Sequence, residues 1–170
     1  MRVAAATLVV LALAAPAVHA AGAEPEVRRD AAPPQAVGKP HSLRTIPEAC
    51  ATLVGVFTGK ADAPYALDAR RTSPGCQPRA RLVDAQKAGA SAEAGWILND
   101  RIRVPSAACA GRQVVVEVWR RPGEAGVPDR DGQGQARIYL REGLAKARAG
   151  ALAALPAYAV SMQLQGKPCD

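Results

Sequence analysis

The chain has 170 residues, a length that favours one domain over two. It contains 22 lysines and arginines against 15 acidic residues, and this formal net charge of +7 favours anionic partners without specifying a fold. Aromatic residues make up only 4% of the chain, which argues against sugar-stacking platforms and base-stacking modules, so we expect no nucleic-acid partner.

The first twenty residues have the features of a secretory signal peptide. Arg2 precedes an apolar run over residues 3–15, and the small residues Val18 and Ala20 fit a signal-peptidase site. We therefore expect cleavage after Ala20, a periplasmic or extracellular location, and no stable membrane span in the mature chain. The alternative is an uncleaved anchor, because residues 3–23 carry no formal charge.

The next segment, residues 21–40, is rich in alanine and contains four prolines but only two branched apolar residues. Such a composition buries too little apolar surface to offset the entropy lost on ordering, so we expect a flexible lead-in. A single disulfide-stapled domain is then expected over residues 41–170.

The first half of this domain contains two predicted strands. Thr45 and Glu48 have capping-box spacing, which predicts a short helical turn through Cys50. A strand is predicted over 52–58, a loop over 65–75 and a second strand over 78–84. In the second strand Ala80 and Leu82 face inward, and Arg79 and Arg81 face outward. Residues 85–95 are predicted to be a loop or one weak helix.

A third strand is predicted over residues 96–104. Its apolar side chains share one face if the strand alternates regularly: Trp96, Leu98, Ile102 and Val104. Asp100 interrupts that face, and burial would penalise its charge unless an arginine contacts it. Asp100 is thus the most interesting acid for general acid–base chemistry, and the alternatives are a structural salt bridge or a bulge that turns it outward.

The strongest strand prediction is the segment 112–120, around which the sheet is organised. Val114, Val116 and Val118 alternate with more polar residues, as in a strand that buries one face. A short loop over 105–111 joins it to the preceding strand. After it come a long loop over 121–134, a strand over 135–141 and a helix over 142–155 that Pro156 ends.

The four cysteines are expected to form two disulfides, because an even number in an exported chain is typical of an oxidising compartment. A last strand over 157–164, antiparallel to the valine strand, would bring Cys169 near Cys109. The long connection after the first strand would return Cys76 to Cys50. The fold class expected is α+β: a small, mainly antiparallel sheet of five or six strands, one helix in the C-terminal half and two disulfides.

Arginines at outward strand positions are the candidate binding residues. Two arginines two residues apart on a strand project to the same face, and neighbouring strands would combine them into a basic surface for anionic ligands. The residues are Arg79, Arg81, Arg101, Arg103, Arg137 and Arg141. The alternative is an ordinary solvated sheet face.

No metal, cofactor or catalytic residue is assigned. Residues 129–134 resemble the first half of a calcium loop, but Leu140 stands where the bidentate glutamate is required, so a polar turn is the interpretation. The chain lacks CxxC spacing, and His41 is the only histidine outside the leader, which disfavours zinc sites and a Ser-His-Asp triad.

These features favour an exported, non-enzymatic binding protein for an anionic envelope component or a protein partner. The first alternative is an inhibitor of a secreted hydrolase that presents the loop 121–134. The second is a hydrolase that uses carboxylates, with Asp100 as its candidate acid.

Overall fold

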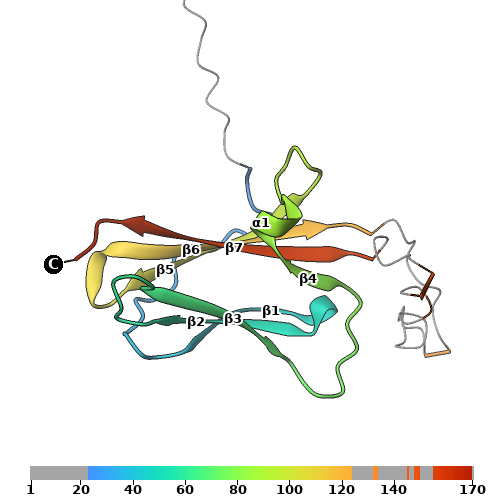
Figure 1. The fold of residues 1–170 in the computed structure, drawn as a ribbon, viewed down its shortest axis with the longest axis horizontal. Helices are drawn as coiled ribbons and strands as arrows, with labels where there is room; N and C mark the ends of the chain where they lie inside the picture. Colours follow the sequence, from blue (N-terminus) through green and yellow to red (C-terminus); the bar gives the residue numbers. More distant parts are fainter. Residues whose placement is uncertain (1–22, 124–131, 134–144, 146–147, 150–154, 170) are drawn as a thin grey trace, which may run out of the picture.

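The computed structural model describes residues 23–123, 132–133, 145, 148–149 and 155–169, which form two stacked β-sheets (Figure 1). One sheet has the strand order β1-β2-β3, with β1 (His41–Ile46), β2 (Ala51–Phe57) and β3 (Tyr65–Arg71). The other has the order β4-β7-β6-β5, with β4 (Arg81–Asp84), β5 (Ile97–Ser106), β6 (Cys109–Arg121) and β7 (Ala157–Gly166). All neighbouring strands are antiparallel except β4 and β7.

The mainly antiparallel architecture is confirmed, but the described residues contain seven strands in two layers, where one sheet of five or six strands was expected. The valine strand is β6, which lies between β5 and β7. Val114, Val116 and Val118 are fully buried and face the three-stranded sheet. The core between the layers is completed from both sheets, mainly by Ile46, Leu53, Phe57, Tyr65, Ile102 and Val104.

The predicted turn before Cys50 is a short 3₁₀ helix, η1 (Pro47–Ala49), but the capping box does not form. Ile46 is the N-cap and makes no side-chain cap hydrogen bond. The Thr45 hydroxyl instead lies 3.1 Å from the hydroxyl of Thr52 on β2, which is directly opposite on the sheet. Pairing between β1 and β2 therefore replaces the predicted cap.

The loop predicted over residues 65–75 is wrong for its first part, because β3 pairs with β2 along its whole length. Most of its side chains are exposed, so an apolar face does not mark it as a strand. Its anchor is Tyr65, whose ring meets Phe57 edge-on with centroids 4.8 Å apart. Gly55 leaves the space for that ring, since an added Cβ would lie 1.7 Å from the Tyr65 hydroxyl oxygen.

Each sheet contains a bulge that changes which side chains face the core. In β5, Leu98 lies opposite Trp119 and Asp100 opposite Val118, so Asn99 is the extra residue. In β1, Ser42 pairs with Val54 and Arg44 with Leu53, so Leu43 is the extra residue. Both bulges turn the residue that follows them, Asp100 or Arg44, toward the interior.

The bulge in β5 corrects the predicted face of that strand. Ile102 and Val104 belong to the core between the sheets, but Trp96 does not. Trp96 packs with Ala85, Ala157 and Ala159 on the opposite, outer side of the four-stranded sheet. The regular alternation assumed for 96–104 fails because Asn99 adds one residue to the strand.

Residues 23–40, the N-terminal edge segment, differ from the flexible lead-in expected. The segment runs parallel to the free edge of β5, and its backbone N–H groups donate to carbonyls of that strand: Glu26 to Leu98, Val27 to Asn99, Ala32 to Arg103 and Gln35 to Pro105, all at 2.8–2.9 Å. Pro25 precedes the first of these donors, and Pro33 and Pro34 fall between Ala32 and Gln35, as an edge position allows. The composition of the segment gave the wrong prediction because backbone pairing and ion pairs, rather than apolar burial, hold the segment on the sheet.

Both predicted disulfides are confirmed. Cys50–Cys76 ties the turn before β2 to the segment leading into β4, and Cys109–Cys169 ties the start of β6 to the residues after β7. The first disulfide therefore links the start of the three-stranded sheet's β2 to the chain just before β4, and the second links one end of β6 to the residues that follow β7.

The one-turn helix α1 (Ala85–Ala88) follows β4 and is the weak helix considered for residues 85–95. Several predicted elements lie outside the described residues: the leader, the strand over 135–141, most of the loop 121–134 and most of the helix 142–155. Over the described ranges, no helix has the length and apolarity needed to cross a bilayer.

Gly55→Ala should lower the free energy of unfolding by about 1–3 kcal/mol, because its Cβ would overlap the Tyr65 side chain in a packed core. Gly75→Ala is the matched control, since open space surrounds that position. Urea unfolding of both variants measures the difference. Equal stability of the two variants would contradict the packing of Tyr65 over β2.

Candidate functional site

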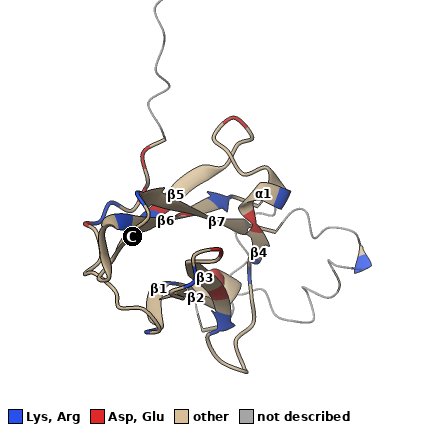
Figure 2. Ribbon diagram, turned by 60° about the vertical axis from the view of Figure 1, so that its left-hand side comes forward, with Lys and Arg blue, Asp and Glu red and all other residues tan. Residues whose placement is uncertain are grey.

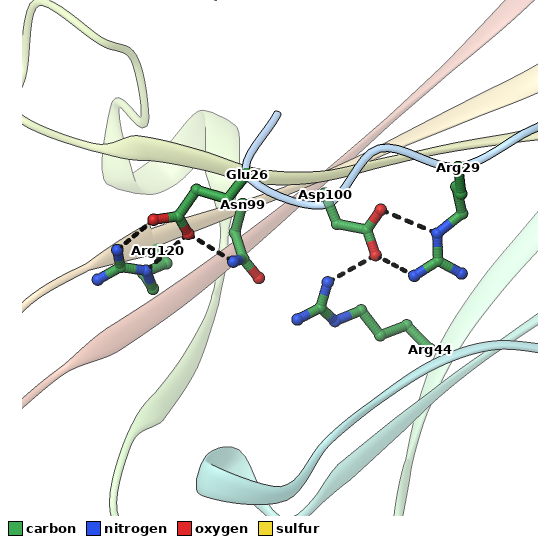
Figure 3. A network of polar contacts seen from close by, with 6 residues as sticks. All are labelled: Glu26, Arg29, Arg44, Asn99, Asp100 and Arg120. Atoms are coloured by element: carbon green, nitrogen blue, oxygen red, sulfur yellow. Dashed lines mark hydrogen bonds and ion pairs between the residues drawn. The ribbon is translucent and has the colours of Figure 1, made fainter. Parts of the chain in front are cut away.

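Asp100 is the fully buried acid at the centre of a polar cluster (Figure 3). Arg29 of the edge segment donates to both of its oxygens, from Nε to Oδ1 at 3.1 Å and from Nη2 to Oδ2 at 2.5 Å. Arg44 of β1 donates from Nη1 to Oδ2 at 2.6 Å. One carboxylate thus joins the edge segment, the four-stranded sheet and the three-stranded sheet.

This geometry confirms the structural salt bridge considered for Asp100 and removes the access to solvent that an acid–base catalyst needs. The carboxylate makes three charge-assisted hydrogen bonds, and two guanidinium groups offset its charge. The side chain of Arg44 is itself only 19% exposed. Asp100 therefore has a stabilising role in the described structure.

Glu26 forms a second cluster next to the first, on the same bulge. Its carboxylate accepts hydrogen bonds from Asn99 Nδ2 at 2.6 Å and from Arg120 Nε and Nη2 at 2.9 and 2.5 Å. These bonds favour the charged form and lower the pKa of Glu26 to about 2, with the Arg120 hydrogen bond as the largest cause. The edge segment is consequently held to the sheet by two carboxylate clusters, one at the bulge residue Asn99 and one at Asp100, which follows it.

The predicted binding arginines that lie on described strands project from the same face of the four-stranded sheet, but they lie at two different edges of it. By register, Arg81, Arg101 and Arg103 all project from the outer face of the four-stranded sheet, away from the core. Arg81 is on β4 and the other two are on β5, at opposite edges of the sheet. Arg79 precedes β4 and is exposed. Arg137 and Arg141 lie outside the described residues.

At the β5 edge, Arg101 and Arg103 meet two arginines that composition had assigned to the lead-in, Arg28 and Arg29. Together with Glu24 and Pro25, the four arginines line a hollow of about 380 Å³, the basic groove. Part of this charge is compensated within the protein. Arg28 pairs with Glu24, Arg29 with Asp100, and Arg101 with Glu117 at 2.9 Å.

Arg103 is the groove residue whose charge stays available, since its exposed side chain forms no ion pair with the described residues. The paired arginines also keep unused donors, because a guanidinium has five N–H groups and a carboxylate engages at most two or three. The groove can therefore bind a sulfate, phosphate or carboxylate group through several donors at once. Figure 2 shows in blue the basic positions on the four-stranded sheet and on α1.

Sequence reasoning missed Arg28 and Arg29 because it treated residues 21–40 as unstructured. A signal was present: Asp100 interrupts an apolar strand and requires a cation if buried. That requirement could not identify which arginine would satisfy it. Within the described ranges, no cluster of three histidine, cysteine or acidic side chains could hold a metal ion. Most of the calcium-like segment 129–134 falls outside those ranges.

Comparison of the chain with protein-family models, with curated proteins and with solved structures finds no match.

Asp100→Asn should lower the free energy of unfolding by about 3–5 kcal/mol, because it leaves the guanidinium groups of Arg29 and Arg44 without their counter-charge. Asp68→Asn is the control, since Asp68 pairs with Arg70 at 3.7 Å on the exposed face of β3 and should cost under about 0.5 kcal/mol. Denaturant unfolding measures both, and a neutral Asp100→Asn would contradict the structural role.

Glu26→Gln should reduce the loss of stability in acid. The folded-state pKa of Glu26 is about 2 against an ordinary value of 4.5, so the unfolded chain takes up the proton first as the pH falls. The stabilisation from Glu26 is present above about pH 4.5 and is lost between pH 4.5 and 2. Urea unfolding at pH 6 and pH 3 should show a smaller decrease in the variant, and an equal decrease would refute the Glu26–Arg120 contact.

Proposed function

We propose that this is an exported, non-enzymatic protein that binds an anionic polymer, such as an envelope component, on the outer face of its four-stranded sheet. The observation that carries the proposal is the basic groove, where Arg28 and Arg29 of the edge segment lie beside Arg101 and Arg103 of β5. Guanidinium groups in such an arrangement can form paired hydrogen bonds with sulfate, phosphate or carboxylate groups.

An extended ligand fits the distribution of charge better than a compact one. Arg103 on β5 and Arg81 on β4 project from the same face, with β6 and β7 between them. Three strand spacings separate them by about 14 Å across the sheet, and the register places them about 20 Å apart along the strands. A polyanion that crosses the sheet could contact both edges.

Export is supported by the two disulfides, which are compatible with an oxidising compartment. The leader-like composition of residues 1–20 supports a periplasmic or extracellular location. A protein partner with an acidic surface is the second candidate, because the same groove would accept clustered carboxylates.

The two other functional hypotheses have less support from the described residues. Most of the loop 121–134 that an inhibitor would present lies outside them. The acid favoured for a hydrolase, Asp100, is buried and fully paired.

The double variant Arg28→Gln/Arg103→Gln should elute from a heparin column at lower salt than the unmodified protein. Removing two cationic contacts should also reduce the slope of log K against log salt by about two, because each contact releases about one counterion. Fluorescence titration with labelled heparin at several salt concentrations measures that slope.

Arg70→Gln is the matched control, because Arg70 is an exposed arginine on β3 in the other sheet. It removes one charge and should leave the slope unchanged. If Arg70→Gln weakens heparin binding as much per charge as the double variant, the interaction reflects overall charge and the groove is not its site.

A further inference from the structure

A second hollow lies at the opposite edge of the same sheet, where β4, α1 and the end of β6 meet. It has a volume of about 700 Å³, which is within the range of small-molecule sites. We call it the α1 pocket. It shares no lining residue with the basic groove.

Three cations line the α1 pocket: Arg81 of β4, Lys87 of α1 and Arg121 at the end of β6. None of them forms an ion pair with a described residue. The acid beside them, Asp84, is the N-cap of α1, and its Oδ1 accepts the backbone N–H of Lys87 at 3.0 Å. The pocket therefore has an excess of positive charge that its own carboxylate does not neutralise.

The other part of the pocket wall is apolar and includes Trp96, Val83 and Ala157. Trp96 is only 5% exposed, yet its indole Nε1 has no hydrogen-bond partner among the described residues. Because the Nε1 atom itself has almost no accessible surface, Trp96 contributes apolar ring surface to the pocket wall. The guanidinium carbon of Arg121 lies 6.0 Å from the centre of the Trp96 ring, which brings the charged and apolar parts of the wall together.

We propose that the α1 pocket binds a small amphipathic anion, in which one carboxylate or phosphate group is attached to an apolar body. The anionic group meets Arg81, Lys87 and Arg121, and the apolar body packs against Trp96 and Val83. Three cations that form no ion pair within the described part of the chain, combined with an apolar wall, distinguish this ligand from a bare ion and from a neutral lipid. The α1 pocket and the basic groove have different lining residues, although Arg81 of the pocket also lies on the path proposed for a polyanion across the sheet.

Titration calorimetry on the unmodified chain tests the class of ligand. Dodecanoate and dodecyl phosphate, each below its micelle concentration, should bind with one-to-one stoichiometry. Inorganic phosphate lacks the apolar body, and dodecyltrimethylammonium carries the opposite charge, so both should bind at least about tenfold more weakly. Vesicles with anionic phospholipid, added as a separate arm, show whether the ligand is taken from a bilayer or from solution.

Variants then locate the binding site. Arg81→Gln and Arg121→Gln should each weaken dodecanoate binding by about tenfold or more, the effect expected for one charge-assisted hydrogen bond. Ala88→Phe should abolish binding, because it places a larger side chain into the pocket wall. Arg103→Gln, in the basic groove, should leave dodecanoate affinity unchanged.

Trp96 provides an independent readout. In a Trp119→Phe background it is the only tryptophan, and its fluorescence should change in a saturable way with dodecanoate. The proposal is overturned if dodecanoate does not bind, if the cationic analogue binds equally well, or if Arg81→Gln and Arg121→Gln bind dodecanoate like the parent. None of these outcomes bears on the effect of Arg28→Gln/Arg103→Gln on heparin binding, because the basic groove has different lining residues.

Discussion

The carboxylate of Asp100 is the contact on which the arrangement of this chain depends. It is completely buried, and it is joined to Arg29 and Arg44, which come from two other segments of the chain. A buried charge of this kind is stable only with its partners in place. Two bulges make the contact geometrically feasible, since Asn99 turns Asp100 inward from one sheet and Leu43 turns Arg44 inward from the other. The stacking of the sheets and the position of the edge segment are consequently linked through one side chain.

The same bulge in β5 accounts for both candidate sites on the outer face. Residues at the bulge, Leu98 and Asn99, form the hydrogen bonds that hold Glu26 and Val27 and so place the neighbouring Arg28 beside Arg101 and Arg103. The bulge also moves Trp96 out of the core between the sheets and into the wall of the α1 pocket. A regular strand would have buried Trp96 with Ile102. One inserted residue thus positions a polar groove at one edge and contributes the aromatic wall of a pocket at the other.

Elements whose formation depends on short-range sequence patterns could be predicted from the sequence. The alternation of Val114, Val116 and Val118 predicted β6, and its antiparallel pairing with β7 explains the predicted Cys109–Cys169 disulfide. β3 was missed because backbone pairing with β2 and one aromatic anchor, Tyr65, hold it without an apolar face. The edge segment was missed because its partners are some seventy residues away in the chain: Arg29 pairs with Asp100 and Glu26 with Asn99. No periodicity in 96–104 marks the bulge at Asn99.

Amide hydrogen exchange of the edge segment tests the central claim most directly. The amides of Val27, Ala32 and Gln35 donate to β5, so they should exchange slowly in the unmodified protein. In Asp100→Asn their protection should fall sharply, while amides in the middle of β6, such as Val116, stay protected. Exchange of these three amides at the rate of an unstructured peptide in the unmodified protein would contradict the account, because the segment would then be free of the sheet.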